Sequence, residues 1–286
     1  MSQEIVLITG TSSGLGMCAA AMLVKHPSQK YKVYAAMRNT AKKDELLKKA
    51  GECGEKNLVV IQLDVCSDDS VHAAVKDILD KEGRIDVLVN NAGIGLLGVL
   101  EEQSWEAIMN TFNTNVFGVF RMLRAIVPSM KKKKKGRIIN ISSIGGLLGL
   151  PFNTVYGSTK YALEGITECL APQLAQFNIH VSAVEPGPIS TQFAPTAFTH
   201  MSAFQPKDEP TKALFDKFVE GFNTTWMIEG VLQSGDECAE YVLKAIVDEK
   251  PQVHYLTNKT LEESVKVKFN DMTGEECLKR SMKYIS

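Results

Sequence analysis

The segment Leu7-Ile-Thr-Gly-Thr-Ser-Ser-Gly-Leu-Gly16 decides the fold of this chain. An apolar run that begins at Glu4 leads into it, and a segment of helical period, 14–26, follows it. Glycine lets the backbone turn tightly between a strand and a helix and approach a pyrophosphate, whose charge the N–H groups at the start of the helix can meet. We therefore predict that this first β-α junction binds a dinucleotide through Gly10, Ser12, Ser13, Gly14, Leu15 and Gly16.

The same alternation of apolar runs and helical segments continues along the chain. The later apolar runs are YKVYAAM (31–37), LVVIQLD (58–64), DVLVN (86–90), GRIINIS (136–142) and IHVSAVEP (179–186), and the later helical segments are 40–50, 68–82, 104–130 and 155–177. Continuous Val/Ile/Leu runs between helices are typical of a parallel sheet that is covered on both faces. We predict an α/β fold, a doubly wound (Rossmann) parallel sheet with six strands up to Glu185 and right-handed connections.

Residues 187–230 interrupt this alternation and are rich in aromatic side chains. Seven aromatic residues lie between 190 and 228, in a chain with 12 Phe, 7 Tyr and 2 Trp. Four of them form one helical stripe, although such a stripe packs into a core more often than it lines a ligand site: Phe215, Phe218, Phe222 and Trp226. We expect a single domain, 1–286, with a helical substrate lid at about 187–230 and a C-terminal extension at about 251–286.

Composition excludes several classes of function. The 32 Lys and Arg nearly cancel the 33 Asp and Glu, so no overall positive field would attract nucleic acid. No signal peptide and no apolar stretch of membrane-spanning length is visible. The six cysteines are scattered, with no spacing typical of disulfide frameworks or metal ligands. We expect a soluble cytoplasmic protein with no metal, no nucleic-acid partner and no integral membrane segment.

Two other interpretations of the glycine loop fail. Gly10-Thr-Ser-Ser-Gly14 also fits the G-x-S-x-G elbow of hydrolases. That elbow needs an acidic residue and then a histidine at later strand ends, and none of the five histidines, His26, His72, His180, His200 and His254, is a convincing partner. A phosphate-binding P-loop requires a G-K-[ST] triplet, which is absent here.

The cofactor type is predicted from the end of the second strand. NAD enzymes place an acidic residue about 20 residues after the glycine loop, whereas an arginine there suits the 2′-phosphate of NADP. Arg38 occupies this place and the preceding residue is Met37, so we predict NADP(H). Ligands of such sheets bind at the carboxyl ends of strands, which adds Asp64, Val65, Asn91 and Gly93 to the cofactor site.

The most informative group consists of Ser143, Tyr156 and Lys160. Tyr156 and Lys160 are four residues apart in a helical segment, so both side chains lie on one face. A lysine ammonium beside a phenol would lower the phenol pKa, and a shift of about three units requires roughly 4 kcal/mol. Ser143 ends the fifth predicted strand and can hold a substrate oxygen next to the tyrosine. The three residues predict acid–base chemistry at a carbonyl or hydroxyl group.

Together these motifs resemble the short-chain dehydrogenase/reductase family. They occur in family order: T-G-x-x-x-G-x-G at Thr9–Gly16, N-N-A-G at Asn90–Gly93, Asn115, Ser143, Y-x-x-x-K at Tyr156–Lys160, and Pro186-Gly187 with Thr191. Segments 146–165 and 176–188 are similar to the branch of the 17β-hydroxysteroid and retinol dehydrogenases, which acts on lipophilic alcohols and their carbonyls.

The resemblance implies a role for each matching residue. Tyr156 would donate or accept the proton, Lys160 would lower the tyrosine pKa and bind the nicotinamide ribose, and Asn115 would hold a water that links the lysine to solvent. The nicotinamide would lie beside Pro186, Gly187, Ile189 and Thr191. The substrate would contact Ser143, Leu150, Asn153, Tyr156, Phe222 and Trp226. The family commonly forms homodimers through the helices expected at 104–130 and 155–177.

Two departures from the family pattern change what we expect of the catalytic helix and of the substrate. Pro172 falls inside the helix that carries Tyr156 and Lys160, where we expect it to kink the last turns. The steroid-specific branch places a histidine in the lid helix, whereas 211–247 contains none and Asn223 takes that place, which argues against estrogen recognition. We expect an NADP(H)-dependent oxidoreductase of a steroid or retinoid. The alternatives are a non-catalytic NADP(H)-binding regulator and a reductase of small cytosolic carbonyls.

Overall fold

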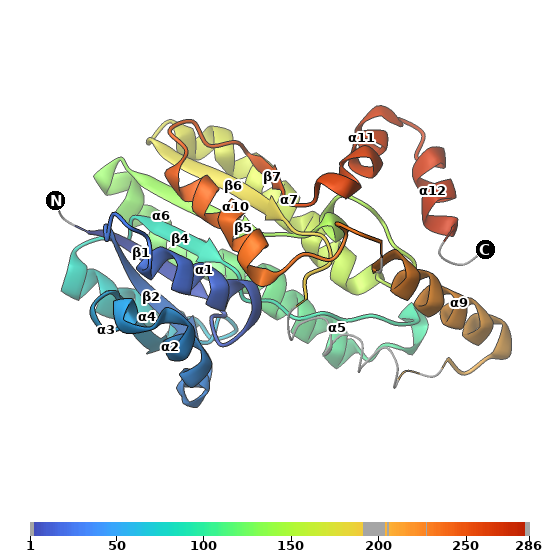
Figure 1. Cartoon of the computed structure of the whole chain (residues 1–286), viewed down its shortest axis with the longest axis horizontal. Helices are drawn as coiled ribbons and strands as arrows, with labels where there is room; N and C mark the ends of the chain where they lie inside the picture. Colours follow the sequence, from blue (N-terminus) through green and yellow to red (C-terminus); the bar gives the residue numbers. More distant parts are fainter. Residues whose placement is uncertain (1–2, 191–203, 205, 227, 284–286) are drawn as a thin grey trace.

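The computed structural model describes residues 3–190, 204, 206–226 and 228–283 (Figure 1). Within these residues one parallel sheet has the strand order β3-β2-β1-β4-β5-β6-β7. The strands are β1 (Glu4–Thr9), β2 (Tyr31–Met37), β3 (Leu58–Gln62), β4 (Val87–Asn90), β5 (Gly136–Ile141), β6 (Ile179–Glu185) and β7 (His254–Leu256). The strand order reverses between β1 and β4, so the predicted doubly wound sheet is confirmed.

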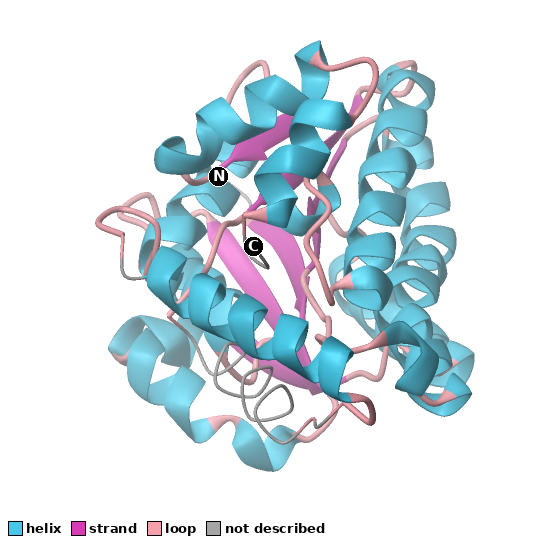
Figure 2. Cartoon of the chain, turned by 90° about the vertical axis from the view of Figure 1, so that its right-hand side faces the viewer, coloured by secondary structure: helices cyan, strands magenta, loops and turns pink. Residues whose placement is uncertain are grey.

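Helices cover both faces of the sheet (Figure 2). One hydrophobic core contains residues of α1 (Gly14–Val24), α2 (Asp44–Ala50) and α10 (Gly235–Val247). The other core contains residues of α4 (Asp68–Glu82), α6 (Gly118–Lys133) and α7 (Thr154–Ala175). The Val/Ile runs of the central strands are buried because each face packs against such a layer.

Three elements differ from the sequence prediction. The helix expected at 104–130 is divided into α5 (Trp105–Phe112), a π-helical turn (Asn113–Phe117) and α6. The seventh strand, β7, was not predicted, because its three residues show no apolar run and its conformation comes from parallel pairing with β6. A short helix α3 (Glu52–Asn57) also precedes β3.

Pro172 lies inside α7, as the sequence predicts. The helix continues for three residues beyond it, to Ala175, and Leu174 is buried in the core. A proline near the C-terminal end of a helix costs one backbone donor without affecting the turns that carry Tyr156 and Lys160.

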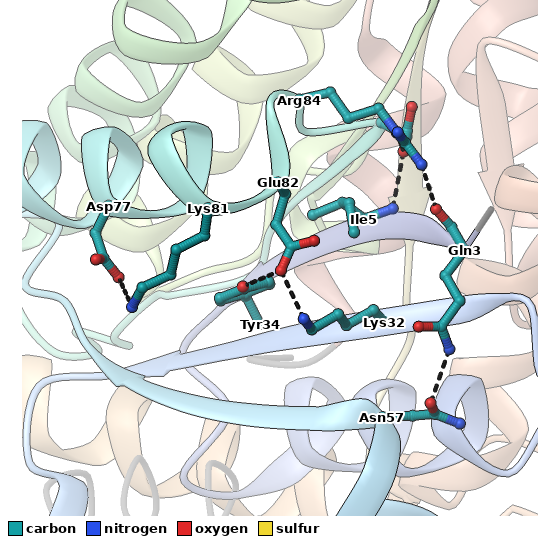
Figure 3. Close-up of polar contacts among 10 residues, drawn as sticks. Gln3, Ile5, Lys32, Tyr34, Asn57, Asp77, Lys81, Glu82 and Arg84 are labelled. Carbon is teal, nitrogen blue, oxygen red and sulfur yellow. Dashed lines mark hydrogen bonds and ion pairs between the residues drawn. The ribbon is translucent and has the colours of Figure 1, made fainter.

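The amino ends of the strands are held by a polar network (Figure 3). Glu82, the last residue of α4, accepts hydrogen bonds from Lys32 Nζ at 2.6 Å and Tyr34 Oη at 2.5 Å. These donors lower the pKa of Glu82. Arg84 Nε donates to Asp86 at 2.9 Å, and the same Asp86 oxygen accepts from the backbone of β1 at 2.8 Å. This network joins α4 and β4 to β1 and β2 at the end of the sheet opposite the candidate site.

The carboxyl end of the sheet is flanked by α9 (Glu209–Trp226), α11 (Glu262–Asn270) and α12 (Glu275–Met282) (Figure 1). Two phenylalanines of α9, Phe215 and Phe218, are buried and pack on Phe152, with ring centroids 5.0 and 5.4 Å away. Among the described helices, none has the length and apolar character required to cross a bilayer.

Candidate functional site

A cavity of about 400 Å³ lies at the carboxyl ends of the central strands. It runs from the glycine loop after β1 to Ser143, Tyr156 and Lys160, and on to Phe222 of α9. The other predicted residues that line it are Gly10, Ser12, Ser13, Gly14, Leu15, Arg38, Asp64, Val65, Asn91, Gly93, Leu150, Asn153, Pro186, Gly187 and Ile189. Thr191 and the side chain of Trp226 lie outside the described part of the chain.

The glycine loop is shaped by close backbone approaches. Gly10 has φ +70°, and a Cβ on it would lie 2.8 Å from the Cα of Ala92. A Cβ on Gly16 would lie 2.3 Å from Asn91 Nδ2, which donates hydrogen bonds to the carbonyl oxygens of Thr9 and Gly10 at 2.8 and 3.0 Å. Gly16 does not line the cavity. Its role here is to let α1 pack against the β4 loop, which fits the third glycine of such motifs.

The start of α1 is open to an anionic ligand. Its N-cap residue, Ser13, makes no side-chain capping bond, and the first turn carries no acidic side chain. The first N–H groups of a helix lack partners within the helix, and its positive end attracts negative charge. The loop therefore fits the pyrophosphate of a dinucleotide.

Charge in the cavity lining also fits a phosphorylated cofactor. Among the described lining residues the cationic side chains are Arg38, Lys42 and Lys160, and the one carboxylate is that of Asp64. Sequence reasoning missed Lys42, which stands four residues after Arg38 at the end of a 3₁₀ turn, Thr40–Lys42. The sequence signal that could have identified Lys42 is a second cationic residue about one turn after Arg38, the predicted ligand of the 2′-phosphate.

Asp64 is tied into its own loop. Its Oδ1 accepts a hydrogen bond from the backbone N–H of Cys66 at 2.9 Å, and its backbone N–H donates to Ser70 Oγ at 2.9 Å. These bonds hold the turn between β3 and α4 in a fixed shape. One carboxylate oxygen of Asp64 is thus occupied by the loop itself.

β5 ends and α7 begins at the same edge of the sheet. This arrangement brings together Ser143, Tyr156 and Lys160. Lys160 is 5% exposed, its Nζ donates to the carbonyl oxygen of Ile141 at 2.8 Å, and it lies 5.5 Å from the ring centroid of Tyr156. The Ser143 hydroxyl accepts from the N–H of Gly145 at 3.1 Å and also hydrogen-bonds to the phenol of Tyr156. A substrate oxygen near the phenol would therefore meet two hydroxyl groups.

Burial controls the protonation of the pair. Burial raises the pKa of Tyr156 to about 12, and the hydrogen bond from Ser143 offsets only part of this rise. Burial also lowers the pKa of Lys160 to about 8, while the Glu164 carboxylate opposes that shift. The Lys160 ammonium lies over the ring of Tyr156 and donates its hydrogen bond to the Ile141 carbonyl, and its predicted lowering of the tyrosine pKa stays a prediction. At neutral pH the phenol holds its proton and the lysine is mostly charged.

Asn115 lies behind the cavity rather than in its lining. It belongs to the π turn and is 1% exposed. Its side chain accepts from the N–H of Ile94 at 2.8 Å and donates to the Ile94 carbonyl at 2.9 Å and to Thr159 Oγ1 at 3.0 Å. Asn115 therefore clamps the loop after β4 to α7, and π turns often occur at functional sites.

The opposite end of the cavity is mostly apolar. Leu97, Ile144, Leu150 and Phe222 line it, together with Asn153. Among the described residues, no hydrogen-bond partner is found for the buried Oδ1 of Asn153. Sequence reasoning missed Leu97 and Ile144, although both stand in apolar segments directly after predicted site motifs.

The aromatic stripe of α9 is divided between two roles. Phe215 and Phe218 are 2% and 0% exposed and form a small hydrophobic core with Phe152 and Phe204 nearby. Phe222, one turn later, lines the cavity. The side chain of Asn223 lies outside the described residues.

A family model and individual known proteins match most of this chain. A family model described as short chain dehydrogenase matches residues 4–202. Retinol dehydrogenase 8 of Bos taurus is 42% identical over 272 residues, which cover 94% of this chain and 86% of that protein. The 17-beta-hydroxysteroid dehydrogenase type 1 of Homo sapiens is 38% identical over 277 residues, 96% of this chain and 83% of that protein.

Solved structures show the same fold. A short-chain dehydrogenase from Streptomyces avermitilis has a TM-score of 0.76 and 29% identity, and the match covers 98% of this chain and 99% of that one. The structure described as ElxO with NADP bound has a TM-score of 0.73 and 31% identity, over 89% of this chain and 96% of that one.

Proposed function

The chain belongs to the short-chain dehydrogenase family, and from this premise we propose that it is an NADP(H)-dependent oxidoreductase that interconverts the hydroxyl and carbonyl groups of a steroid or retinoid. The observation that carries the proposal is the shared cavity, in which Ser143, Tyr156 and Lys160 face the same space as the glycine loop. One cofactor can thus reach from the loop to the acid–base residues.

The chain's own groups supply the proton and orient the substrate. The hydroxyl of Ser143 donates a hydrogen bond to the substrate oxygen and holds it at the phenol. Tyr156, protonated at neutral pH because of its raised pKa, gives its proton to that oxygen during carbonyl reduction. The Lys160 ammonium stabilises the phenolate that remains, and Asn115 keeps α7 and the β4 loop in place. NADP(H), when bound, supplies or accepts the hydride.

The preference for NADP(H) rests on Arg38 and Lys42. These two cations lie beside the end of β2, and the lining residues from β2 to Lys42 include no carboxylate. Such a surrounding favours a 2′-phosphate over a free 2′-hydroxyl. ElxO, whose structure has NADP bound, is a relative of the same fold.

The lipophilic substrate class rests on the walls near Ser143. Among the described residues, apolar side chains line much of this end of the cavity, and Asn153 offers a polar group beside the acid–base residues. Such a pocket favours a large apolar molecule with one reacting oxygen. Two relatives, retinol dehydrogenase 8 and 17-beta-hydroxysteroid dehydrogenase type 1, carry names that fit this class.

Homodimer formation and a cytoplasmic location remain parts of the proposal. Large apolar side chains are exposed along α5, the π turn and α6, where the family resemblance places the subunit contact: Trp105, Met109, Phe117 and Phe120. Exposed apolar groups in one region are typical of protein interfaces. Sedimentation at micromolar concentration would test the dimer, with Phe120→Lys as the disrupting variant.

Oxidation of NADPH, followed at the nicotinamide absorbance, tests the activity. The panel is all-trans-retinal, estrone, androstenedione and a small aldehyde, with NADH in parallel. Turnover of one lipophilic carbonyl with NADPH supports the proposal. Turnover of the small aldehyde alone would identify a reductase of small carbonyls, and NADPH binding without turnover of any carbonyl would favour a non-catalytic regulator.

A further inference from the structure

A buried charged cluster lies directly beneath the acid–base residues. Glu164 and Glu185 are 5% and 1% exposed, and His254 lies between them. His254 Nδ1 is 2.6 Å from Glu185 Oε1 and 3.5 Å from Glu164 Oε2. Two carboxylates in a protein interior are costly unless a cation faces them. None of these three side chains takes part in the proposed reaction.

The cluster belongs to a column of charges on α7. Tyr156, Lys160, Glu164 and Glu168 follow one another at intervals of four residues, so their side chains lie on one face of the helix. The column starts in the cavity and ends at the surface, where Glu168 is exposed and its Oε1 is 3.4 Å from His254 Nε2. Glu164 is therefore the carboxylate between the buried ammonium and the solvent.

The cluster is also joined to the turn that carries Ser143. A Cβ on Gly146 would lie 3.0 Å from Glu164 Oε1 and 2.9 Å from the carbonyl oxygen of Lys160. Glu185 ends β6 immediately before Pro186, which lines the cavity. His254 comes from the edge strand β7, where it pairs with Ala183. The cluster thus connects α7, the turn that carries Ser143 and the end of β6 with β7 at the edge of the sheet.

We infer that Glu164, held by His254, is a positioning residue that keeps the side chain of Lys160 charged inside the protein. Glu164 shares the helix face with Lys160, and its negative charge favours the ammonium form against the burial that disfavours it. His254 contributes the cation that allows Glu164 and Glu185 to be buried together.

A divalent cation is the competing occupant of these three side chains. Their ligand atoms lie within 4.8 Å of one another. A metal ion, however, would have to displace the proton held between His254 and Glu185 at 2.6 Å. The two carboxylates also raise the pKa of His254 to about 10. The short contact therefore favours an imidazolium in this position.

Titration of Lys160 by NMR tests the inference without any substrate. In protein labelled with [ε-¹³C]lysine, the Lys160 resonance is the one that Lys160→Arg removes. We expect Glu164→Gln to increase the acid dissociation constant of Lys160 about tenfold, because an opposite charge within one helical turn is lost. Glu164→Asp, which keeps the charge, should stay near the wild-type value. The matched control is Glu168→Gln, one turn further at the exposed end of the column, with an expected change below about twofold.

His254→Gln distinguishes charge from packing. Without the cation of His254 the buried Glu164 carboxylate should take up a proton, so the acid dissociation constant of Lys160 should rise in His254→Gln as it does in Glu164→Gln. Loss of packing alone would leave Glu164 charged and the acid dissociation constant unchanged. No change in the acid dissociation constant of Lys160 in Glu164→Gln, or an equal change in Glu164→Asp, would overturn the inference. A chelator that shifts the wild-type titration would instead assign the cluster to a metal ion and would also overturn it.

The link to catalysis rests on the proposed function and has a separate measurement. If the enzyme turns over a lipophilic carbonyl, the alkaline limb of kcat should move about one pH unit lower in Glu164→Gln and stay in place in Glu168→Gln. If Glu164→Gln shifts the NMR titration of Lys160 but leaves the alkaline limb of kcat in place, only the catalytic part of the inference is overturned. Absence of turnover in the wild-type protein would contradict the proposed function, and the NMR titration would still decide the role of Glu164.

Discussion

The ammonium nitrogen of Lys160 lies 2.8 Å from the carbonyl oxygen of Ile141, the last residue of β5. This bond fixes α7 against the strand that leads to Ser143, two residues later. Tyr156 is one helical turn before Lys160, so the same contact sets the position of the phenol relative to the serine hydroxyl. Removing the reacting group should therefore abolish chemistry while the surrounding frame persists.

Tyr156→Phe should bind NADPH with a dissociation constant within about twofold of the wild type and lower kcat by a factor on the order of 10²–10⁴. Phenylalanine keeps the ring but has no proton to donate. Stopped-flow reduction of the preferred carbonyl and a fluorescence titration with NADPH measure the two quantities. Tyr161→Phe is the matched control, because the Tyr161 hydroxyl donates to the Leu147 carbonyl at 2.8 Å and the residue does not line the cavity. Near-normal turnover in Tyr156→Phe would rule out the phenol as the acid.

The sequence predicted the central fold and much of the candidate site, because these depend on local patterns. Apolar runs and helical periods predict β1 to β6, and the four-residue interval between Tyr156 and Lys160 places both on one helix face. The glycine spacing predicts the loop after β1, where a Cβ at Gly10 or Gly16 meets backbone or side-chain atoms within 3 Å.

Features that arise from tertiary contact could not be predicted in this way. β7 forms because His254 and its neighbours pair with β6, and the π turn around Asn115 forms where a helix must bring an amide to Ile94. The aromatic stripe of α9 has a uniform helical period, yet Phe218 is buried in a core and Phe222 lines the cavity. Periodicity shows that these side chains share a face and leaves open what each one touches.

Arg38→Asp should lower the ratio of kcat/KM for NADPH to that for NADH by at least on the order of 100-fold. Two charge-assisted hydrogen bonds to a phosphate are lost, each worth roughly 1.5–3 kcal/mol, and a carboxylate can bind the free 2′-hydroxyl. Steady-state kinetics with both cofactors measures the ratio, and Lys42→Gln should lower it by a smaller factor. The exposed neighbour Lys43 does not line the cavity, so Lys43→Gln is the control. An unchanged ratio in Arg38→Asp would mean that Arg38 does not bind the 2′-phosphate.

Gly145→Leu should raise KM for the carbonyl substrate at least about tenfold and leave NADPH affinity nearly unchanged. A Cβ on Gly145 lies 3.5 Å from Ser143 Oγ, 3.6 Å from Asn153 Nδ2 and 3.7 Å from Tyr156 Cε1. These are ordinary contacts, so Gly145→Ala should be tolerated, whereas a branched side chain occupies the space of the substrate oxygen. A Cβ on Gly149 meets no atom within 4 Å, which makes Gly149→Leu the control for loop substitutions. Equal KM values in the two leucine variants would contradict this assignment of the substrate space.

Phe218→Ala and Phe222→Ala should have different effects although the residues are one turn apart. Phe218 is fully buried, and its truncation should lower the free energy of unfolding by about 3–5 kcal/mol. Phe222 lines the cavity, so its truncation should raise KM for a lipophilic carbonyl with a smaller loss of stability. Urea unfolding and steady-state kinetics on both variants separate the two effects. A similar loss of stability in both would place Phe222 in the core of the lid instead.

His254→Gln should lower stability at acidic pH and have less effect at alkaline pH. The Glu164 and Glu185 carboxylates raise the pKa of His254 to about 10 from its ordinary value of 6.5. Because the folded state binds the proton more tightly than the unfolded state, this contribution is fully present below about pH 6.5 and is lost as the pH rises through about 10. The difference in the free energy of unfolding between the wild type and the variant should thus be largest at pH 6 and shrink toward pH 10 in urea titrations. His180→Gln is the control of opposite sign, since burial lowers the pKa of His180 and its protonation opposes folding. A difference that does not vary with pH would show that His254 stabilises the edge strand by packing rather than by its charge.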